Sequence, residues 1–218
     1  MTVRIVLLHA TPVAMSPIRA AFADAWPEAE TINLLDDGLS ADRARETELS
    51  GAMIDRFVRF GRYGYDMGAN GILVTCSAFG PAIDRLASEV PVPVLKPNEA
   101  MFEAAVACGQ RIGMLATFGP SVATMTEEFN DYVTKVGSSA VLKTVLVEPA
   151  MDELRKGNAD RHNKLLAARA PELADCDVIM LAHFSTSLAA ADVRGVLSVP
   201  VLTAPHSAVE RMRKVIEK

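Results

Sequence analysis

The segment Arg4-Ile5-Val6-Leu7-Leu8, RIVLL, decides the fold because the chain repeats it as RIGML at residues 111–115. Other pairs have the same spacing of 107 positions: Phe22 and Phe129, and the triplet PVL at 93–95 and 200–202. Several matches in one order at one offset indicate two copies of a single unit. The opening residues could also suggest a signal peptide, but their recurrence in mid-chain favours a buried strand.

Within each copy, apolar runs alternate with segments of helical spacing. In the first copy, buried strands are predicted at 3–10, 30–37, 71–76 and 92–97. Helices are predicted at 16–26, 47–69, 81–90 and 99–109, the second of them despite its glycines. The second copy has a shorter helix pattern, at about 160–174, where the first has 47–69.

Continuous apolar strands between helices are typical of parallel sheets that are covered on both faces. We therefore expect an α/β protein of two lobes related by a pseudo-twofold axis, each a mostly parallel sheet flanked by helices. Lobe 1 is expected at residues 1–98 and lobe 2 at 99–205, with a C-terminal helix at 206–218 packing back on lobe 1.

Composition excludes several classes of function. The net charge of -5 argues against a nucleic-acid or anionic-membrane partner, and no apolar run approaches the roughly 20 residues of a membrane-spanning helix. The three cysteines form neither a disulfide framework nor a CxxC pair, which favours a reducing cytoplasm. The sequence contains no P-loop, no GxGxxG motif and no metal-spaced His/Asp cluster, so it gives no sign of a cofactor or a metal.

Reactive and polar side chains follow the predicted strands. Residues 9–12 and 116–121 come after the first strand of each copy, and residues 76–78 and 183–186 after the third. Ligands of open α/β sheets bind beyond the carboxyl ends of the strands. We therefore expect a cleft between the lobes, where Cys76 and His183, at equivalent positions of the repeat, face each other.

A cysteine at the start of a helix lies near unpaired N–H groups and the positive end of the helix dipole, which lower a thiol pKa. The same N–H groups, with neighbouring hydroxyls, could hold a substrate carboxylate. The predicted catalytic residues are Cys76 and His183. The predicted substrate-binding residues are Thr11, Ser77, Ala78, Thr117, Ser121, Phe184 and Ser185.

The remaining cysteines and histidines have plainer interpretations. Cys108 and Cys176 are expected to pack in apolar surroundings. His9 could contact substrate or make a structural hydrogen bond, and both alternatives stay open. His162 is expected to be a solvated helix residue.

Three motifs resemble the aspartate/glutamate racemase superfamily: VTCSA at 74–78, LATFGPS at 115–121 and DVIMLAHFS at 177–185. That superfamily includes amino-acid and hydantoin racemases, maleate isomerases and arylmalonate decarboxylases. The resemblance implies a cofactor-independent isomerase of the racemase or epimerase type, acting on a small carboxylic or amino acid, in a homodimer or a higher homo-oligomer. It also implies two cysteines on opposite sides of the substrate, the first of which corresponds to Cys76.

The second family cysteine corresponds to His183, so the chain departs from the two-thiol pattern. Imidazole could serve as the second acid/base. Alternatively, a decarboxylation needs only the single thiol as proton donor, or Cys76 attacks as a nucleophile in a cis-trans isomerisation. A fourth alternative is a catalytically inactive protein that binds small acids.

Overall fold

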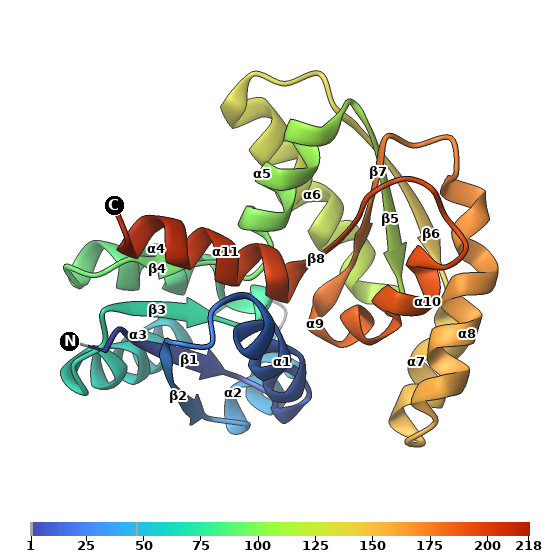
Figure 1. Cartoon of the computed structure of the whole chain (residues 1–218). Helices are drawn as coiled ribbons and strands as arrows, with labels where there is room; N and C mark the ends of the chain where they lie inside the picture. The colour runs from blue at the N-terminus through green and yellow to red at the C-terminus, as the bar shows by residue number, and fades with distance from the viewer. Residues whose placement is uncertain (1, 47) are drawn as a thin grey trace. The chain divides into compact units, whose positions relative to one another are not determined.

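A computed structural model describes residues 2–46 and 48–218, and the chain divides into two compact units. Unit 1 consists of Met1–Asn98 and Ala208–Lys218, and unit 2 of Glu99–Ser207. Each unit contains a four-stranded parallel sheet flanked by helices, shown in Figure 1. The predicted α/β class with parallel sheets is therefore confirmed.

The sheet of unit 1 has the strand order β2-β1-β3-β4. Its strands are β1 (Arg4–His9), β2 (Glu30–Leu35), β3 (Gly71–Val74) and β4 (Val94–Leu95). Its helices are η1 (Pro12–Ala14), α1 (Met15–Ala25), α2 (Gly38–Arg43), α3 (Gly51–Asp66), η2 (Ser77–Phe79) and α4 (Gly80–Glu89). The last helix of the chain, α11 (Ala204–Ile216), contributes its residues from Ala208 onward to this unit.

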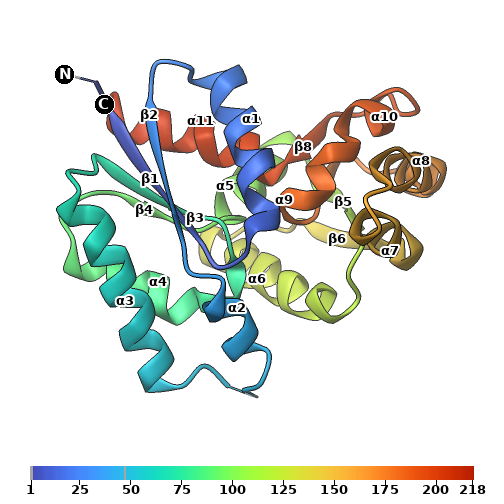
Figure 2. The ribbon, with the colours of Figure 1, turned by 90° about the horizontal axis from the view of Figure 1, so that it is seen from below.

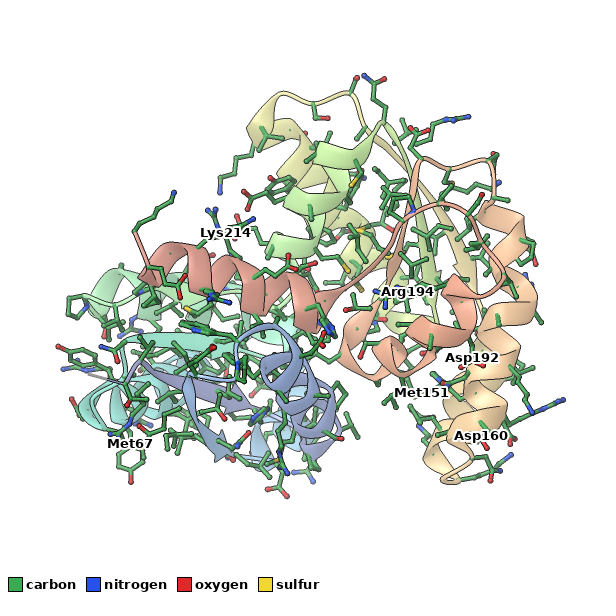
Figure 3. All side chains as sticks on the ribbon, viewed as in Figure 1. Met67, Met151, Asp160, Asp192, Arg194 and Lys214 are labelled. Atoms are coloured by element: carbon green, nitrogen blue, oxygen red, sulfur yellow. The ribbon has the colours of Figure 1, made fainter. Side chains whose placement is uncertain are left out.

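The sheet of unit 2 has the corresponding order β6-β5-β7-β8. Its strands are β5 (Arg111–Ala116), β6 (Val141–Leu146), β7 (Val178–Leu181) and β8 (Val201–Thr203). The helices are α5 (Glu99–Cys108), α6 (Pro120–Val136), α7 (Glu148–Arg155), α8 (Ala159–Arg169), η3 (Ala170–Leu173), α9 (His183–Thr186), η4 (Ser187–Ala189) and α10 (Ala190–Arg194). In Figure 3 Arg194 is labelled; its guanidinium donates to the Val201 carbonyl at 2.9 Å and joins α10 to β8.

The internal repeat is preserved in the register of the strands. Ile5 pairs with Gly71 in unit 1, and the residues 107 positions later, Ile112 and Val178, pair in unit 2. A side-chain contact is preserved as well. The Arg4 N–H donates to Asn70 Oδ1 at 2.8 Å, and the Arg111 N–H donates at 2.9 Å to Asp177, the residue equivalent to Asn70.

Both sheets are covered on two faces, as continuous apolar strands require. In unit 1, α3 and α4 lie on one face, while α1 and the unit 1 part of α11 lie on the other (Figure 2). Alternate residues of β1 and β3, such as Val6 and Ile72, join the core beneath α3 and α4. In unit 2, α7, α8 and α10 cover one face, with Leu115 and Ile179 in the core beneath them, and α5 and α6 cover the other (Figure 1).

The glycines of α3 are explained by close packing. A β-carbon on Gly61 would lie 2.8 Å from Leu86 Cδ1 in α4, and one on Gly64 would lie 2.8 Å from Val6 Cγ1 in β1. The helix predicted over 47–69 forms as Gly51–Asp66, and it tolerates these glycines because they let it approach its neighbours.

Two side chains are placed differently from the prediction. His162 is fully buried rather than solvated, because it lies one turn before Leu166 on the face of α8 that enters the core. Its Nδ1 lies 2.8 Å from Asn163 Oδ1, and its Nε2 has no hydrogen-bond partner among the described residues. Cys108 is exposed rather than packed, because it is the last residue of α5, where the chain leaves the helix. Cys176 is buried, as expected.

Candidate active site

In unit 1 the predicted site residues follow two neighbouring strands. Leu8 of β1 pairs with Val74 of β3; Thr11 comes three residues after Leu8, and Cys76 two residues after Val74. Parallel pairing therefore brings Thr11 and Cys76 to the carboxyl edge of the same sheet. Thr11, Cys76 and Ser77 are partly exposed, and Ala78 is exposed.

Cys76 has an extended backbone, with φ of -134°, and precedes a single 3-10 turn. The α-helix that follows begins only at Gly80. The sequence pattern predicted this helix at 81–90, so its start is close to the prediction. The short turn that separates it from Cys76 was not foreseen.

A buried histidine lies beneath the strand end that carries Cys76. His9 Nδ1 is 2.9 Å from Thr75 Oγ1, and His9 Nε2 is 2.9 Å from Asn33 Oδ1. Burial lowers the pKa of His9, so the ring is neutral at neutral pH and carries one N–H. Because Asn33 Oδ1 can only accept, the N–H is at Nε2, and Nδ1 needs a donor. The Thr75 hydroxyl supplies it; this hydroxyl also lies 3.2 Å from the Leu8 carbonyl, which already accepts from the Thr75 N–H at 3.0 Å. The structure thus gives His9 a hydrogen-bonding role.

Sequence reasoning did not single out Asn33 and Thr75. Both interrupt apolar strand segments, TINLL and ILVT. A polar residue inside a buried strand needs a hydrogen-bond partner, and this signal could have identified both.

In unit 2 the predicted residues again follow neighbouring strands, β5 and β7, in which Leu115 pairs with Leu181. Thr117 is buried, and its hydroxyl lies 3.5 Å from that of Thr186. Phe184 and Ser185 are also buried. Ser121 is in the first turn of α6 and is partly exposed.

His183 and Ser121 are brought together by the fold. His183 Nε2 lies 2.6 Å from Ser121 Oγ, across a sequence separation of 62 residues. Burial lowers the pKa of His183 to about 4, so its imidazole is neutral at pH 7. A neutral imidazole provides one hydrogen-bond donor and one lone pair that can take up a proton.

The backbone of His183 is unusual. Its φ is +66°, the only positive φ of a non-glycine residue in the described part of the chain. The equivalent residue of the repeat, Cys76, is extended. The two positions therefore correspond in sequence and strand register but not in backbone conformation. Non-glycine residues in this region are uncommon and are enriched at functional sites.

Residues 2–46 and 48–218 contain neither a metal-binding cluster nor a membrane-spanning helix. No cluster of three or more His, Cys, Asp or Glu side chains has the arrangement of a metal site. None of the helices in this part of the chain combines the length and apolar character that crossing a bilayer requires.

Comparisons with known proteins agree with this architecture. The sequence model of the family described as Asp/Glu/hydantoin racemase matches residues 15–121, a range that includes Cys76 but not His183. No curated protein sequence matches the chain.

Several solved structures share the fold. An aspartate racemase homologue from Pyrococcus horikoshii has a TM-score of 0.72 at 15% identity, with 100% of both chains covered. Allantoin racemase from Klebsiella pneumoniae has a TM-score of 0.70 at 17% identity, covering 99% of this chain and 88% of that one. A variant of arylmalonate decarboxylase in a sulfate-associated form has a TM-score of 0.70 at 16% identity, covering 98% and 93%. Residues 15–121 therefore match the Asp/Glu/hydantoin racemase family model, and the whole chain shares the fold of these solved structures.

Proposed function

We propose that the protein is a cofactor-independent enzyme of the racemase or epimerase type, acting at the α-carbon of a small carboxylic or amino acid. The observation that carries this proposal is the place of Cys76. Its partly exposed thiol follows a fully buried strand at the carboxyl edge of a parallel sheet, within the segment matched by the racemase family model. The adjoining Thr75 is fixed by His9, which holds this strand end in position.

The proposed reaction uses Cys76 and His183 on the same substrate molecule. With its pKa lowered to about 4, His183 rests as the neutral base and takes the α-proton on its lone pair. The electron pair of the C–H bond moves into the carboxylate to form an enediolate. The Cys76 thiol then gives its proton to the opposite face of the α-carbon. This leaves a thiolate and an imidazolium, and a proton passes from the imidazolium to the thiolate through solvent.

The developing enediolate must be stabilised for the α-proton to leave. In this proposal, hydroxyls and backbone N–H groups near the strand ends hold the carboxylate oxygens. Thr11 and Ser77 are the partly exposed candidates in unit 1. Thr117 and Ser185 are more buried, so they would contact only a deeply bound carboxylate.

A decarboxylase is the second candidate, since the histidine at position 183 leaves Cys76 without a second thiol. In that reaction the C–C electron pair forms the enediolate as carbon dioxide leaves, and the Cys76 thiol supplies the single proton required. The fold of an arylmalonate decarboxylase variant is compatible with this alternative. Cis-trans isomerisation, with Cys76 as a nucleophile, and binding without turnover are further alternatives.

Solvent-deuterium exchange at the α-carbon tests the proposal. Wild type, Cys76→Ala and the matched control Cys108→Ala are incubated in D2O with a panel of amino acids, hydantoins, substituted malonates and maleate. A racemase incorporates deuterium with inversion at the α-carbon in wild type and in the Cys108 variant, whereas the Cys76 variant loses the inversion because no thiol delivers a deuteron to the opposite face. Carbon dioxide release from the malonates identifies a decarboxylase. A change in double-bond geometry identifies a cis-trans isomerase. Ligand binding with none of these reactions would show an inactive binding protein.

A further inference from the structure

We infer that Ser121 is a positioning residue that fixes the tautomer of His183, so that Nε2 carries the proton and Nδ1 carries the lone pair. The tautomer of the resting protein does not depend on which reaction the protein catalyses. A second statement, that Nδ1 receives the substrate proton, rests on the proposed function.

The argument begins with the two contacts of one hydroxyl group. Ser121 Oγ lies 2.7 Å from the Phe118 carbonyl oxygen and 2.6 Å from His183 Nε2. A hydroxyl has one hydrogen and two lone pairs, and a carbonyl oxygen can only accept. A distance of 2.7 Å is typical of an O–H···O bond, so the hydrogen lies between Ser121 Oγ and Phe118 O. Ser121 Oγ must then accept from His183, which requires an N–H at Nε2.

The opposite tautomer is disfavoured by the short distance between Ser121 Oγ and Phe118 O. With the proton on Nδ1, Ser121 would have to donate to Nε2, and its oxygen would face Phe118 O at 2.7 Å without a hydrogen between them. The carbonyl would keep its other donor, the Ser121 backbone N–H at 3.2 Å. The energetic cost of this tautomer would therefore be repulsion between the lone pairs of Ser121 Oγ and Phe118 O, since the carbonyl would still have a hydrogen-bond donor.

This arrangement also argues against Ser121 as a nucleophile. An activated serine donates its hydroxyl proton to the imidazole lone pair. Here the serine hydrogen points to Phe118, and the imidazole is the donor. The Ser121–His183 contact is therefore suited to orienting the base rather than to generating an alkoxide.

The left-handed backbone of His183 is consistent with an orienting contact. A residue at φ of +66° keeps this conformation only where its surroundings determine it. Ser121 is in the first turn of a 17-residue helix, which gives His183 a fixed partner. When Nδ1 takes up a proton, Nε2–H continues to donate to Ser121, so the ring needs no reorientation.

Nitrogen NMR of the full chain labelled with 15N-histidine tests the tautomer directly. Long-range 1H–15N correlations distinguish protonated from unprotonated ring nitrogens, and a His183→Gln variant assigns the signal. At pH 7 we expect His183 to be protonated at Nε2 alone, to become a mixture of tautomers in Ser121→Ala, and to return to the wild-type form in Ser121→Thr. Ser187→Ala is the matched control, because Ser187 Oγ donates to the Phe184 carbonyl on the same segment. A wild-type ring protonated at Nδ1, or a tautomer unchanged in Ser121→Ala, would overturn the inference.

Deuterium exchange separates positioning from substrate binding. We expect Ser121→Ala to lower the exchange rate constant by at least about tenfold at saturating substrate, with a smaller change in KM, and Ser121→Thr to restore it. A change confined to KM would instead make Ser121 a substrate-binding residue. If wild type exchanges no substrate proton, the proposed function fails, and the NMR result still decides the tautomer.

Discussion

His9 Nδ1 lies 2.9 Å from the hydroxyl of Thr75, the residue that precedes Cys76. The other ring nitrogen bonds to Asn33, so one buried side chain joins β1, β2 and the end of β3. The paired register of β3 ends at Val74, and the Thr75 N–H still donates to the Leu8 carbonyl at 3.0 Å. The histidine adds a side-chain contact to this backbone bond, at the residue that precedes the thiol.

Thr75→Val is expected to destabilise the protein by roughly 1–3 kcal/mol, because it leaves a buried nitrogen of His9 without its donor. Thr75→Ser keeps the hydroxyl and should cost less than about 1 kcal/mol. Urea denaturation measures both free energies of unfolding, and equal losses in the two variants would contradict the hydrogen-bonding role of Thr75.

The three thiols should differ in reactivity. Cys176 is buried, and its pKa is raised by burial and by the neighbouring Asp175, whereas Cys108 is exposed and Cys76 is partly exposed. Iodoacetamide should modify Cys76 and Cys108 in the native protein and reach Cys176 only after unfolding. Peptide mass spectrometry gives the three rates. If Cys76 is catalytic, it should react faster than Cys108 and be protected by a bound acid, while a native Cys176 that reacts as fast as Cys108 would contradict its burial.

Gly61→Ala should destabilise unit 1 by roughly 1–3 kcal/mol, although alanine is the better helix former. The added methyl would lie 2.8 Å from Leu86 Cδ1 and 3.0 Å from Leu86 Cγ, so this fully buried side chain would have to shift. Gly51→Ala, in the first turn of the same helix, is the matched control, since a β-carbon there meets nothing within 4 Å. Thermal unfolding should show a lower Tm for the Gly61 variant and an unchanged or slightly higher Tm for the Gly51 variant. The packing argument would be wrong if both variants were stabilised.

Stability should fall as the pH is lowered from about 6.5. Burial lowers the folded-state pKa of His9, His162 and His183, the last to about 4. Below the unfolded value of about 6.5, the unfolded chain binds protons that the folded chain does not, so the free energy of unfolding decreases. The neutral histidines make their full contribution to the free energy of unfolding above pH 6.5. This contribution is lost as the pH falls toward their folded-state pKa values. For His183 alone the loss is roughly 3 kcal/mol between pH 6.5 and 4.

Urea denaturation at pH 8, 7, 6 and 5 measures this dependence. His162→Gln and His183→Gln should each reduce the slope between pH 7 and 5. Stability that is constant or rises as the pH falls over that interval would contradict the neutral state of these imidazole rings.

The sequence by itself determined the duplication, the two parallel sheets and the position of Cys76 after a buried strand. Periodicity carries this information, because a continuous apolar run can be buried only between two layers of helix, and a fixed offset preserves the register of equivalent strands. The correspondence of Asn70 with Asp177 is one result of that register.

Only the tertiary structure decided which polar groups meet. The 2.6 Å contact between Ser121 and His183 joins residues 62 positions apart, and the partners of His9 come from two other strands. Such contacts depend on side-chain rotamers, and for His183 also on a left-handed backbone, neither of which an apolar pattern encodes. The burial of His162 likewise depends on which face of α8 packs against the core. The sequence could therefore locate the residues at the strand ends, while the fold assigned their hydrogen-bond partners and protonation states.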